Sequence, residues 1–456
     1  MTGYIPTAWV NNSTPAISAA NLGKIETELV NLHARGGFYV DDYAGTDDQK
    51  VAAARADAIA WVTNNSNFVP TIRFGPRKYT LNNQITYFNG ETWLGHSFNE
   101  REYTAPSPTG NWGQASTAIK LQPAGGTGLN PVGFFVPTAG DYTGLQVHAI
   151  VFEGSRTVSF FQTTIYPTVM AMAYFDHCGW NQFHHVLWAT CSACTFSNIQ
   201  LQGCWDTAFK LGGSDTFIGG TRWNYFDSQN TLFADGSAGV DGNGTPDGSG
   251  VGKPVIWLEG SAGNCVAWTL KDLYITPTYS STAIRLDNVS DCVVDNVNLD
   301  SPLQYAGRSG RGGGITVTGN STVSITNTRI VGTMTGAQAT RDARSWTDEG
   351  AFGGYINVLG GSVSMNGVQF ANAYGRNNNT RTDPTPANTP HIYIGSGARQ
   401  VLGSNLLVEP TDGSTMRNLK IGGAAGFAAK IRNGTGTDAG GGTIGGQPWV
   451  GTSGTW

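Results

Sequence analysis

The feature that most constrains the fold of this chain is an internal repeat with an offset of 31 residues. Ile284 and Leu286 align with Ile315 and Val317, and one residue separates the apolar pair in each copy. Four more positions match at this offset without a gap: Cys292 with Val323, Val294 with Ile325, Asn296 with Asn327, and Leu299 with Ile330. Alternating apolar residues within a fixed longer period are typical of a solenoid, in which each repeat is a rung of short strands stacked on the next.

Asparagines recur at fixed places in this repeat. The segment 196–201 matches the segment 294–299, with an asparagine third in each. Asparagine tolerates the left-handed backbone conformation that a tight turn requires. We therefore expect turn asparagines at Asn198, Asn296 and Asn327, stacked on one another as a ladder. Looser copies of the repeat, with a deletion or an insertion, begin at Ile256, Ile356 and Ile392.

Composition excludes several classes of protein. Glycine supplies 63 of the 456 residues, and charged residues make up 13 %, about half their usual share. Aromatic residues reach 11 % and the formal net charge is only −5. The chain is therefore too apolar for a disordered protein and not basic enough for a nucleic-acid binder held by phosphate contacts. Its scarcity of Lys and Glu also argues against a helical bundle.

The sequence contains no recognisable membrane or export signal. No apolar run approaches the roughly 18 residues of a membrane-spanning helix. The first six residues lack the basic and apolar regions of a secretory signal peptide. We expect synthesis in a cytoplasm and no insertion into a membrane.

Patterning divides the chain into four parts. Residues 1–36 contain one amphipathic helix, and residues 37–65 contain a second helix that would cover the end of the solenoid. Residues 66–430 form the solenoid, and residues 431–456 are a Gly-rich tail. Four polar insertions interrupt the solenoid, at 236–252, 308–313, 336–350 and 377–390. Insertions of this kind collect on particular faces of a solenoid, where they often build a binding groove.

Two segments resemble known families. The segment 9–26, a Trp, a polar turn, Thr-Pro and a short helix ending in Ile-Glu, resembles the N-termini of bacteriophage tail and baseplate proteins. The helix led by Asp47-Asp48 and the strand 74–79 together resemble the opening of the pectate-lyase-like superfamily, which includes many phage tailspikes. Phe74, Pro76 and Tyr79 match the family motif, but Lys78 stands where the family has glycine. The resemblance implies a mainly β protein, a right-handed parallel β-helix with a short α-helical N-terminal segment and cap.

The same resemblance implies a function. Tailspikes of this kind are homotrimers in the virion that bind, and in some cases cleave, a polysaccharide of the bacterial surface. The expected role is thus a tailspike or receptor-binding protein that is joined to other tail or baseplate proteins through its N-terminus. Two alternatives remain open: a tail protein that binds without cleaving or is purely structural, and a free polysaccharide lyase or glycoside hydrolase.

Sugar binding requires aromatic faces together with carboxylates and amides, and these are densest between residues 174 and 259. Rungs lie about 4.8 Å apart, so carboxyls one or two rungs apart would reach the separations used by retaining or inverting glycosidases. The candidate acids and bases are Asp176, Asp206, Asp227 and Glu259. The candidate glycan-binding residues are Trp180, Trp205, Trp223, Tyr225 and Arg222. The competing interpretation is that each Asp only accepts hydrogen bonds from turn amides.

Other chemistries have weaker support in the sequence. A lyase needs a base, and Lys210, Arg222 and Lys271 lie in the same region. Zinc binding is one possible interpretation of Cys191-x-x-Cys194, which lies near His177, His184 and His185. However, these cysteines lie in segments that are predicted to be strands, where cysteine acts as a small buried apolar residue. The oxygen-rich segment 235–248 could hold Ca²⁺, but its spacing fits neither an EF-hand nor the Gly-Gly-x-Gly-x-Asp repeat, so a plain loop is the expected interpretation. We expect no metal and no cofactor.

Overall fold

The computed structural model describes part of the chain, and all statements below concern that part. The described residues are 22, 24, 25, 37–65, 71–86, 88–96, 117–126, 131–136, 142–155, 157–162, 169–204, 207–220, 225–227, 254–260, 265–276, 282–300, 313–331, 355–371, 391–408, 421–423, 429–432, 443–444 and 447–448. Most of the predicted helix in 1–36, most of the tail 431–456 and the four insertions lie outside them. No helix in these ranges is both long and apolar enough to cross a membrane.

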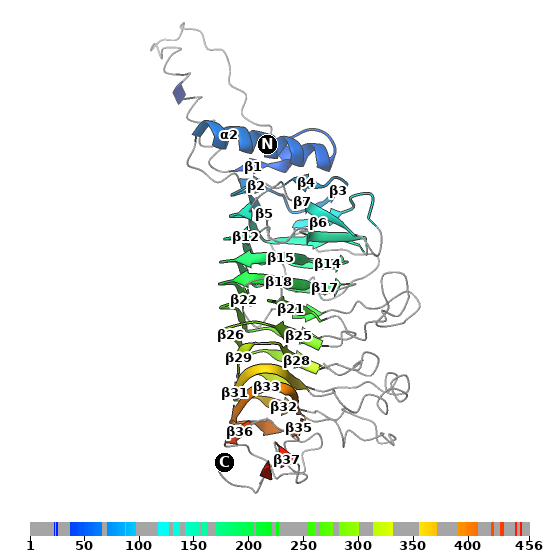
Figure 1. The fold of residues 1–456 in the computed structure, drawn as a ribbon. Coiled ribbons are helices and arrows are strands. Elements are labelled where there is room, and N and C mark those ends of the chain that lie inside the picture. The colour runs from blue at the N-terminus through cyan, green and yellow to red at the C-terminus, as the bar shows by residue number, and fades with distance from the viewer. Residues whose placement is uncertain are drawn as a thin grey trace, which may run out of the picture.

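The described strands stack in parallel along one axis to form a parallel β-helix, as predicted (Figure 1). Each rung places one strand in each of three sheets, in the order first, second, third, and the chain then passes to the next rung. One such rung consists of β25 (Thr282–Asp287), β26 (Cys292–Asp295) and β27 (Asn298–Asp300), and the next of β28 (Gly313–Thr318), β29 (Thr322–Thr326) and β30 (Arg329–Val331). The predicted offset is confirmed, because Ile284 pairs with Ile315 and Leu299 with Ile330.

The first and second sheets are continuous, because β31 (Ile356–Asn366) and β33 (Ile392–Ser404) run through both. The first sheet further contains β4 (Ile85–Thr86), β7 (Val132–Val136), β11 (Val158–Gln162), β15 (Leu187–Ser192), β18 (Phe209–Ser214), β21 (Ile256–Glu259), β25, β28 and β35 (Ile421–Gly423). The second contains β1 (Phe38–Tyr39), β2 (Thr71–Arg73), β5 (Thr92–Leu94), β9 (Gln146–His148), β13 (Tyr174–Asp176), β16 (Thr195–Ser197), β19 (Phe217–Gly219), β23 (Thr269–Lys271), β26, β29 and β36 (Ala429–Arg432). Short strands connect the two: β8 (Tyr142–Thr143), β12 (Val169–Ala171) and β22 (Cys265–Val266).

The third sheet is built from eleven described strands. They are β3 (Lys78–Leu81), β6 (Thr117–Leu121), β10 (Ile150–Glu153), β14 (Gly179–Phe183), β17 (Gln200–Cys204), β20 (Tyr225–Asp227), β24 (Tyr274–Thr276), β27, β30, β32 (Gln369–Ala371) and β34 (Leu407–Val408). A separate antiparallel pair, β37 (Thr443–Ile444) and β38 (Gln447–Pro448), lies near the C-terminus. Each of the four insertions joins a strand of the third sheet to the next strand of the first, so all four leave and re-enter the solenoid at the same corner.

One left-handed residue separates the second sheet from the third in many rungs. Asn198, Asn296 and Asn327 occupy this position with φ of 50°, 52° and 48°, which confirms the predicted turns. Asn296 and Asn327 occupy the same position on successive rungs, but in the part of the chain that the structure describes their side-chain amides do not hydrogen-bond one another as the expected ladder would. The side-chain amide of Asn198 instead donates to Asp176 of the preceding rung, at 2.8 Å, and that of Asn327 donates to Asp295, at 3.0 Å. A carboxylate accepts where a second amide was expected, because its two oxygens carry no competing donor.

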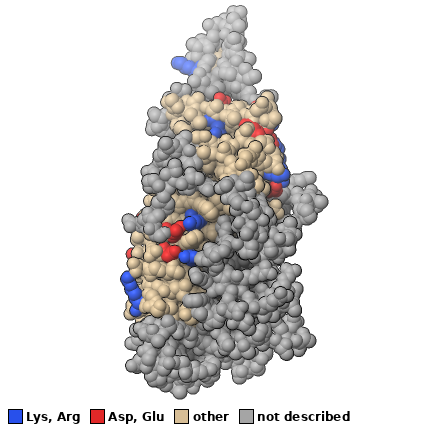
Figure 2. Space-filling view, turned by 45° about the vertical axis from the view of Figure 1, so that its right-hand side comes forward, with Lys and Arg blue, Asp and Glu red and all other residues tan. Residues whose placement is uncertain are grey.

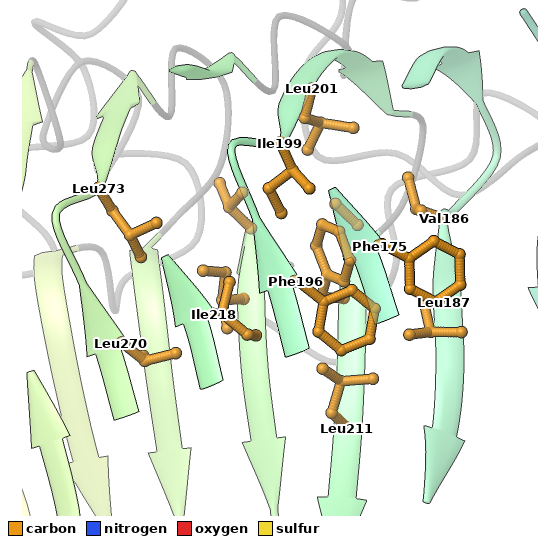
Figure 3. Packing of buried hydrophobic residues seen from close by; sticks show 14 of the residues in the cluster. Phe175, Val186, Leu187, Phe196, Ile199, Leu201, Leu211, Ile218, Leu270 and Leu273 are labelled. Carbon is orange, nitrogen blue, oxygen red and sulfur yellow. The ribbon is translucent and has the colours of Figure 1, made fainter. Parts of the chain in front are cut away.

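The interior of the solenoid is filled by columns of apolar side chains, one from each rung. Phe175, Phe196, Ile218 and Leu270 are partners in register on successive strands, and all point into the core (Figure 3). The Phe175 and Phe196 rings are stacked with centroids 5.1 Å apart. The six cysteines, which are Cys178, Cys191, Cys194, Cys204, Cys265 and Cys292, are free and buried, as predicted. Burial raises the pKa of the Cys265 thiol to about 12.

The helix α2 (Asp47–Asn65) covers the first rungs, and a short 3-10 helix, η1 (Val40–Asp42), precedes it (Figure 1). The N-terminus of α2 is capped by Thr46 and Gln49: the side chain of each accepts a hydrogen bond from the backbone N–H of the other. The Asp47 and Asp48 carboxylates extend instead to the solenoid, where they accept from the backbone N–H groups of Thr80 and Asn82. The helix therefore closes the open strand edge, which would otherwise be free to pair with other strands.

Candidate functional site

Aromatic and cationic side chains alternate along the outer face of the first sheet. Trp188, Lys210, Trp257 and Arg285 occupy one register position on four successive strands, β15, β18, β21 and β25. Their neighbours along each strand, such as Leu211 and Leu258, are buried in the core. Because side chains alternate between the two faces of a strand, these four residues project outward. We call them, together with Glu259 and Asp287, the Trp–cation ladder.

The rings and cations of the ladder contact one another. The Lys210 Nζ lies 4.3 Å from the ring centroid of Trp257 and 5.8 Å from that of Trp188. The Arg285 Cζ lies 4.7 Å from the Trp257 centroid. Because β18 and β25 flank β21 on opposite sides, the two cations approach Trp257 from opposite sides. At the other end of the ladder, the His185 ring stacks on Trp188 with centroids 3.9 Å apart.

Each cation of the ladder is also held by a carboxylate two residues further along the strands. Lys210 forms an ion pair with Glu259 at 2.8 Å, and Arg285 forms one with Asp287 at 3.3 Å. Glu259 and Asp287 are partners in register on adjacent strands, so they lie one rung apart. Asp287 additionally accepts from the Thr318 hydroxyl at 2.6 Å. The four ionised groups sum to no net charge.

The ladder presents two buried donors that have no acceptor. The Trp257 Nε1 and the Arg285 Nε are both inaccessible to water, and neither has a hydrogen-bond partner within the described part of the chain. Figure 2 shows blue and red side chains gathered in a hollow of the described surface, at the height of β18, β21 and β25 in Figure 1. The site thus combines indole rings with partly exposed carboxylates and cations of no net charge, which suits a neutral ligand rich in hydroxyl groups.

The structure places three of the four predicted acids and bases, and these three lie on different sheets. Glu259 belongs to the ladder on the first sheet, Asp176 ends β13 of the second sheet, and Asp227 ends β20 of the third. Three different sheets face three different directions. The side chain of Asp227 and the whole of Asp206 lie outside the described residues. The carboxylate one rung from Glu259 is Asp287, which the sequence interpretation missed.

Asp176 has the environment of a structural carboxylate. Although burial raises the pKa of the Asp176 carboxyl, hydrogen bonds from Asn198, His177 and Ser197 outweigh burial and bring this pKa below its usual value. The same arrangement recurs at Asp295 with Thr326 and Asn327, and at Asn366 with Ser404 and Asn405. Because an amide at residue 366 fills the same place, this position requires an acceptor and not an ionised carboxylate.

Most of the predicted glycan-binding residues lie outside the described part of the chain. Trp205, Trp223 and Arg222 lie outside the described residues, and Tyr225 is described only as the start of β20. Trp180 is 1 % exposed, and its ring packs among Phe160, Phe175 and Phe209. In this structure Trp180 is a core residue, because the residue at its position in β14 points inward.

Of the predicted lyase residues, Lys210 belongs to the ladder, and Lys271 forms an ion pair with Asp295 on the second sheet at 3.5 Å. Arg222 and the segment 235–248 are outside the described part of the chain. Among the residues that the structure describes, no three His, Cys, Asp or Glu side chains are grouped so that they could hold a metal ion.

The sequence did carry a signal for the ladder. The repeat aligns Ile256-x-Leu258 with Ile284-x-Leu286, and the residues interleaved with these apolar positions are Trp257 and Arg285. The residues that follow are Glu259 and Asp287. An alignment of the outward positions, in place of the inward ones, would have found both pairs.

Comparison with solved structures shows that other proteins share this fold. No protein-family model matches the sequence, and no curated protein is similar to it. The structure of DFA-IIIase from Arthrobacter chlorophenolicus A6 in complex with GF2 is similar with a TM-score of 0.51 and 12 % identity, over 88 % of this chain and 94 % of that one. The tailspike protein of E. coli bacteriophage HK620 in complex with a pentasaccharide has a TM-score of 0.47 and 11 % identity, over 89 % of this chain and 66 % of that one. At these identities the likeness is one of fold alone.

Proposed function

We propose that this chain is a carbohydrate-binding β-helix protein and that a polysaccharide lies along the Trp–cation ladder. The observation that carries the proposal is the alternation of Trp188, Lys210, Trp257 and Arg285 over four successive rungs. A polymer with repeated polar groups matches such a surface, because each rung offers the next part of the polymer a new set of contacts.

The contacts follow from the chemistry of the site. Hydroxyl groups of a sugar would donate to the Glu259 and Asp287 carboxylates and accept from the partly exposed Lys210 ammonium and Arg285 guanidinium groups. The two flanking cations limit access to the faces of the Trp257 ring. A sugar would therefore contact the outward edge of this indole, and hydrogen bonds would contribute more to its binding than stacking.

We further propose that the protein is a phage tailspike or receptor-binding protein, which acts in a virion at the bacterial surface. The support is the resemblance of residues 9–26 to phage tail proteins and of residues 74–79 to the pectate-lyase-like superfamily. The homotrimer and the attachment of the N-terminal segment to other tail or baseplate proteins belong to the same proposal.

Hydrolysis is a second candidate function, and one observation favours it. Glu259 and Asp287 are one rung apart, or about 4.8 Å between strands, near the ~5 Å separation of carboxyls in retaining glycosidases. One of two such residues must hold a proton to act as the general acid. Because each of these carboxylates is already ion-paired with a cation, the geometry supports binding more than cleavage.

The test is a glycan array that carries bacterial capsular and O-antigen polysaccharides, probed with the purified full-length protein. We expect binding to a defined glycan, with at least a tenfold loss of affinity in Trp257→Ala. The matched control is Lys271→Ala, which removes an ion pair of the same kind from the second sheet. Incubation with the bound glycan then separates the functions: new reducing ends show a hydrolase, added ultraviolet absorbance from unsaturated uronates shows a lyase, and no product shows a binding protein. Failure to bind any glycan would overturn the proposal.

A further inference from the structure

Exposed apolar side chains gather on the outer face of the second sheet. In the described part of the chain, all the exposed large apolar side chains except Ile25 lie on this sheet or at its edge. They are Tyr39, Met172, Tyr174, Val293 and Leu402, with exposed fractions from 36 % to 61 %. Single exposed apolar residues are normal on a protein surface, but their collection on one face is typical of a surface that another macromolecule covers.

A line of uncharged residues runs along this face. The residues at one register position on nine successive strands, from β9 to β33, are Gln146, Tyr174, Thr195, Phe217, Thr269, Val293, Ser324, Ser364 and Leu402. The residue that follows each of them, such as Phe175 or Val294, is buried in the core. Because side chains alternate between the two faces of a strand, these nine side chains project outward. We call them the uncharged column.

Met172 extends the apolar surface to the corner before β13. Its backbone has a φ of 53°, a left-handed conformation that few residues other than glycine and asparagine adopt, and its side chain is 61 % exposed. The same turn position holds Ala193, Asp215 and Ala267 in the next three rungs, with φ from 52° to 58°. Within one chain, an exposed methionine there contributes no burial to offset the cost of its backbone conformation. Contact with another molecule would supply that burial.

The other two faces of the solenoid differ from this one. The first sheet carries the ion pairs of the Trp–cation ladder on its outer face, and the third carries Lys78, Lys120 and Glu153. The four insertions leave the solenoid between the third sheet and the first, which is the corner opposite the second sheet. None of the four therefore begins beside the uncharged column, and the second sheet remains available for a broad contact.

The lack of charge favours a second copy of this chain as the partner. When copies are related by rotation about an axis parallel to the solenoid, each rung meets the same rung of the neighbouring copy. A charge in the column would then lie close to an identical charge and be repelled, whereas a different protein could offer the opposite charge. The charged groups at the neighbouring register position are held within the chain: Lys271 by Asp295 at 3.5 Å, and Asp176 by His177 at 2.8 Å.

We propose that the outer face of the second sheet, with the uncharged column along it, is the interface at which copies of this chain associate side by side. The inference rests on the homotrimer of the proposed function for the number of copies, and it adds the surface that joins them. Nine strands at a spacing of about 4.8 Å span roughly 40 Å. With a width of about 20 Å, the extent of the six residues from Met172 to His177, such a strip reaches the ~800 Å² per copy of a stable interface. The Trp–cation ladder lies on another sheet and stays accessible to a glycan.

The experiment introduces charge into the column of the full-length protein. Val293→Lys and Val293→Glu each bring identical charges together in neighbouring copies, and a mixture of the two variants brings opposite charges together. The matched control is Gln369→Lys, at an outward position on the third sheet, in β32. Sedimentation velocity over a range of protein concentrations measures the mass and the dissociation constant, and circular dichroism shows whether each variant is folded.

We expect the wild type and the control to sediment as oligomers and each variant of Val293 to associate at least tenfold more weakly. The mixture of Val293→Lys and Val293→Glu is expected to reassemble, because opposite charges then meet, and a general loss of folding would not be reversed in this way. If substitution at Val293 prevents folding, Leu402→Lys and Leu402→Glu provide the same test at another exposed position of the column.

The outcomes separate this inference from the proposed function. An oligomer that no charge in the column weakens would overturn this interface and leave the homotrimer in place on another surface. A monomeric wild type that binds a glycan would overturn the interface and the homotrimer together, but not carbohydrate binding. An oligomer that dissociates when Val293 is substituted, but binds no glycan, would support the interface and overturn the carbohydrate proposal.

Discussion

Glu259 and Asp287 are partners in register on adjacent rungs, and each holds a cation of its own: Lys210 for Glu259 and Arg285 for Asp287. The same two cations flank the Trp257 ring. Two ion pairs and one indole therefore form a single unit on the outside of the first sheet. Substitution of either carboxylate releases a cation next to the ring, so the site can be dissected one charge at a time.

The first prediction concerns these two carboxylates as ligands for sugar hydroxyls. Glu259→Gln and Asp287→Asn each lower glycan affinity about tenfold or more, because a hydrogen bond to a charged group contributes about 1.5–3 kcal/mol. Calorimetric titration with the bound oligosaccharide measures the loss. Each substitution changes the free energy of unfolding by about 1 kcal/mol or less, since the ion pairs are partly exposed. Unchanged affinity in both variants would remove Glu259 and Asp287 from the binding site.

The second prediction concerns the attachment of the cap helix. Glu91 is 2 % exposed and forms an ion pair with Arg55 of α2, while it accepts from the Trp93 Nε1–H at 2.8 Å. Glu91→Ala leaves the buried Trp93 Nε1–H without its acceptor and the half-buried Arg55 guanidinium with only the Thr86 carbonyl, and it costs about 2–3 kcal/mol. Urea unfolding of the variant measures this loss. Lys271→Ala, which removes a partly exposed ion pair, is the control and shifts stability by about 1 kcal/mol or less.

The third prediction concerns acid. The pKa of Asp176 is lower in the folded chain than its usual value of about 3.9, which we take for the unfolded chain. Between these two values the unfolded chain binds more protons, so the stabilisation from Asp176 is present above pH 4 and is lost as the pH falls through the folded pKa. Asp176→Asn removes this contribution. As the pH falls from about 5 to 3, the free energy of unfolding of the variant therefore declines less steeply than that of the wild type.

The variant Asp176→Asn is expected to fold, because Asn366 accepts the same pair of hydrogen bonds from Ser404 and Asn405 in a later rung. The free energy of unfolding at a series of pH values is the measurement. If the two proteins lose stability in parallel on acidification, the hydrogen bonds to Asp176 do not stabilise its charged form. Glycan binding by this variant at pH 7 is expected to be normal, since Asp176 faces away from the ladder.

The fourth prediction concerns the six cysteines. All are buried, and burial raises the pKa of the thiols of Cys178, Cys265 and Cys292, so little thiolate forms at pH 8. Ellman's reagent is expected to label none of the six in the native protein and all six in denaturant. Rapid labelling of one thiol under native conditions would show that the core opens at that rung.

The inward-facing positions of this fold were readable from the sequence. Ile284 with Ile315 and Cys292 with Val323 were aligned by residue type alone, and both are partners in register. The reason is physical: every rung must bury one face of each strand, so the requirement for apolar residues repeats with the rung. The left-handed turns were readable for the same reason, since few residues other than glycine tolerate a positive φ as well as asparagine does.

The outward-facing positions were decided by the tertiary structure. Nothing in the core requires Glu259 to be followed one rung later by Asp287, or Trp257 by Arg285, and only stacking in register places them together. Asp176 and Glu259 were both candidate acids in the sequence. Asp176, however, lies on another sheet and accepts hydrogen bonds from Ser197 and Asn198 of the next rung. The sequence by itself therefore determined the solenoid and its register, because burial imposes a period. Which surface residues meet was determined only by the stacking of rungs whose connecting segments differ in length.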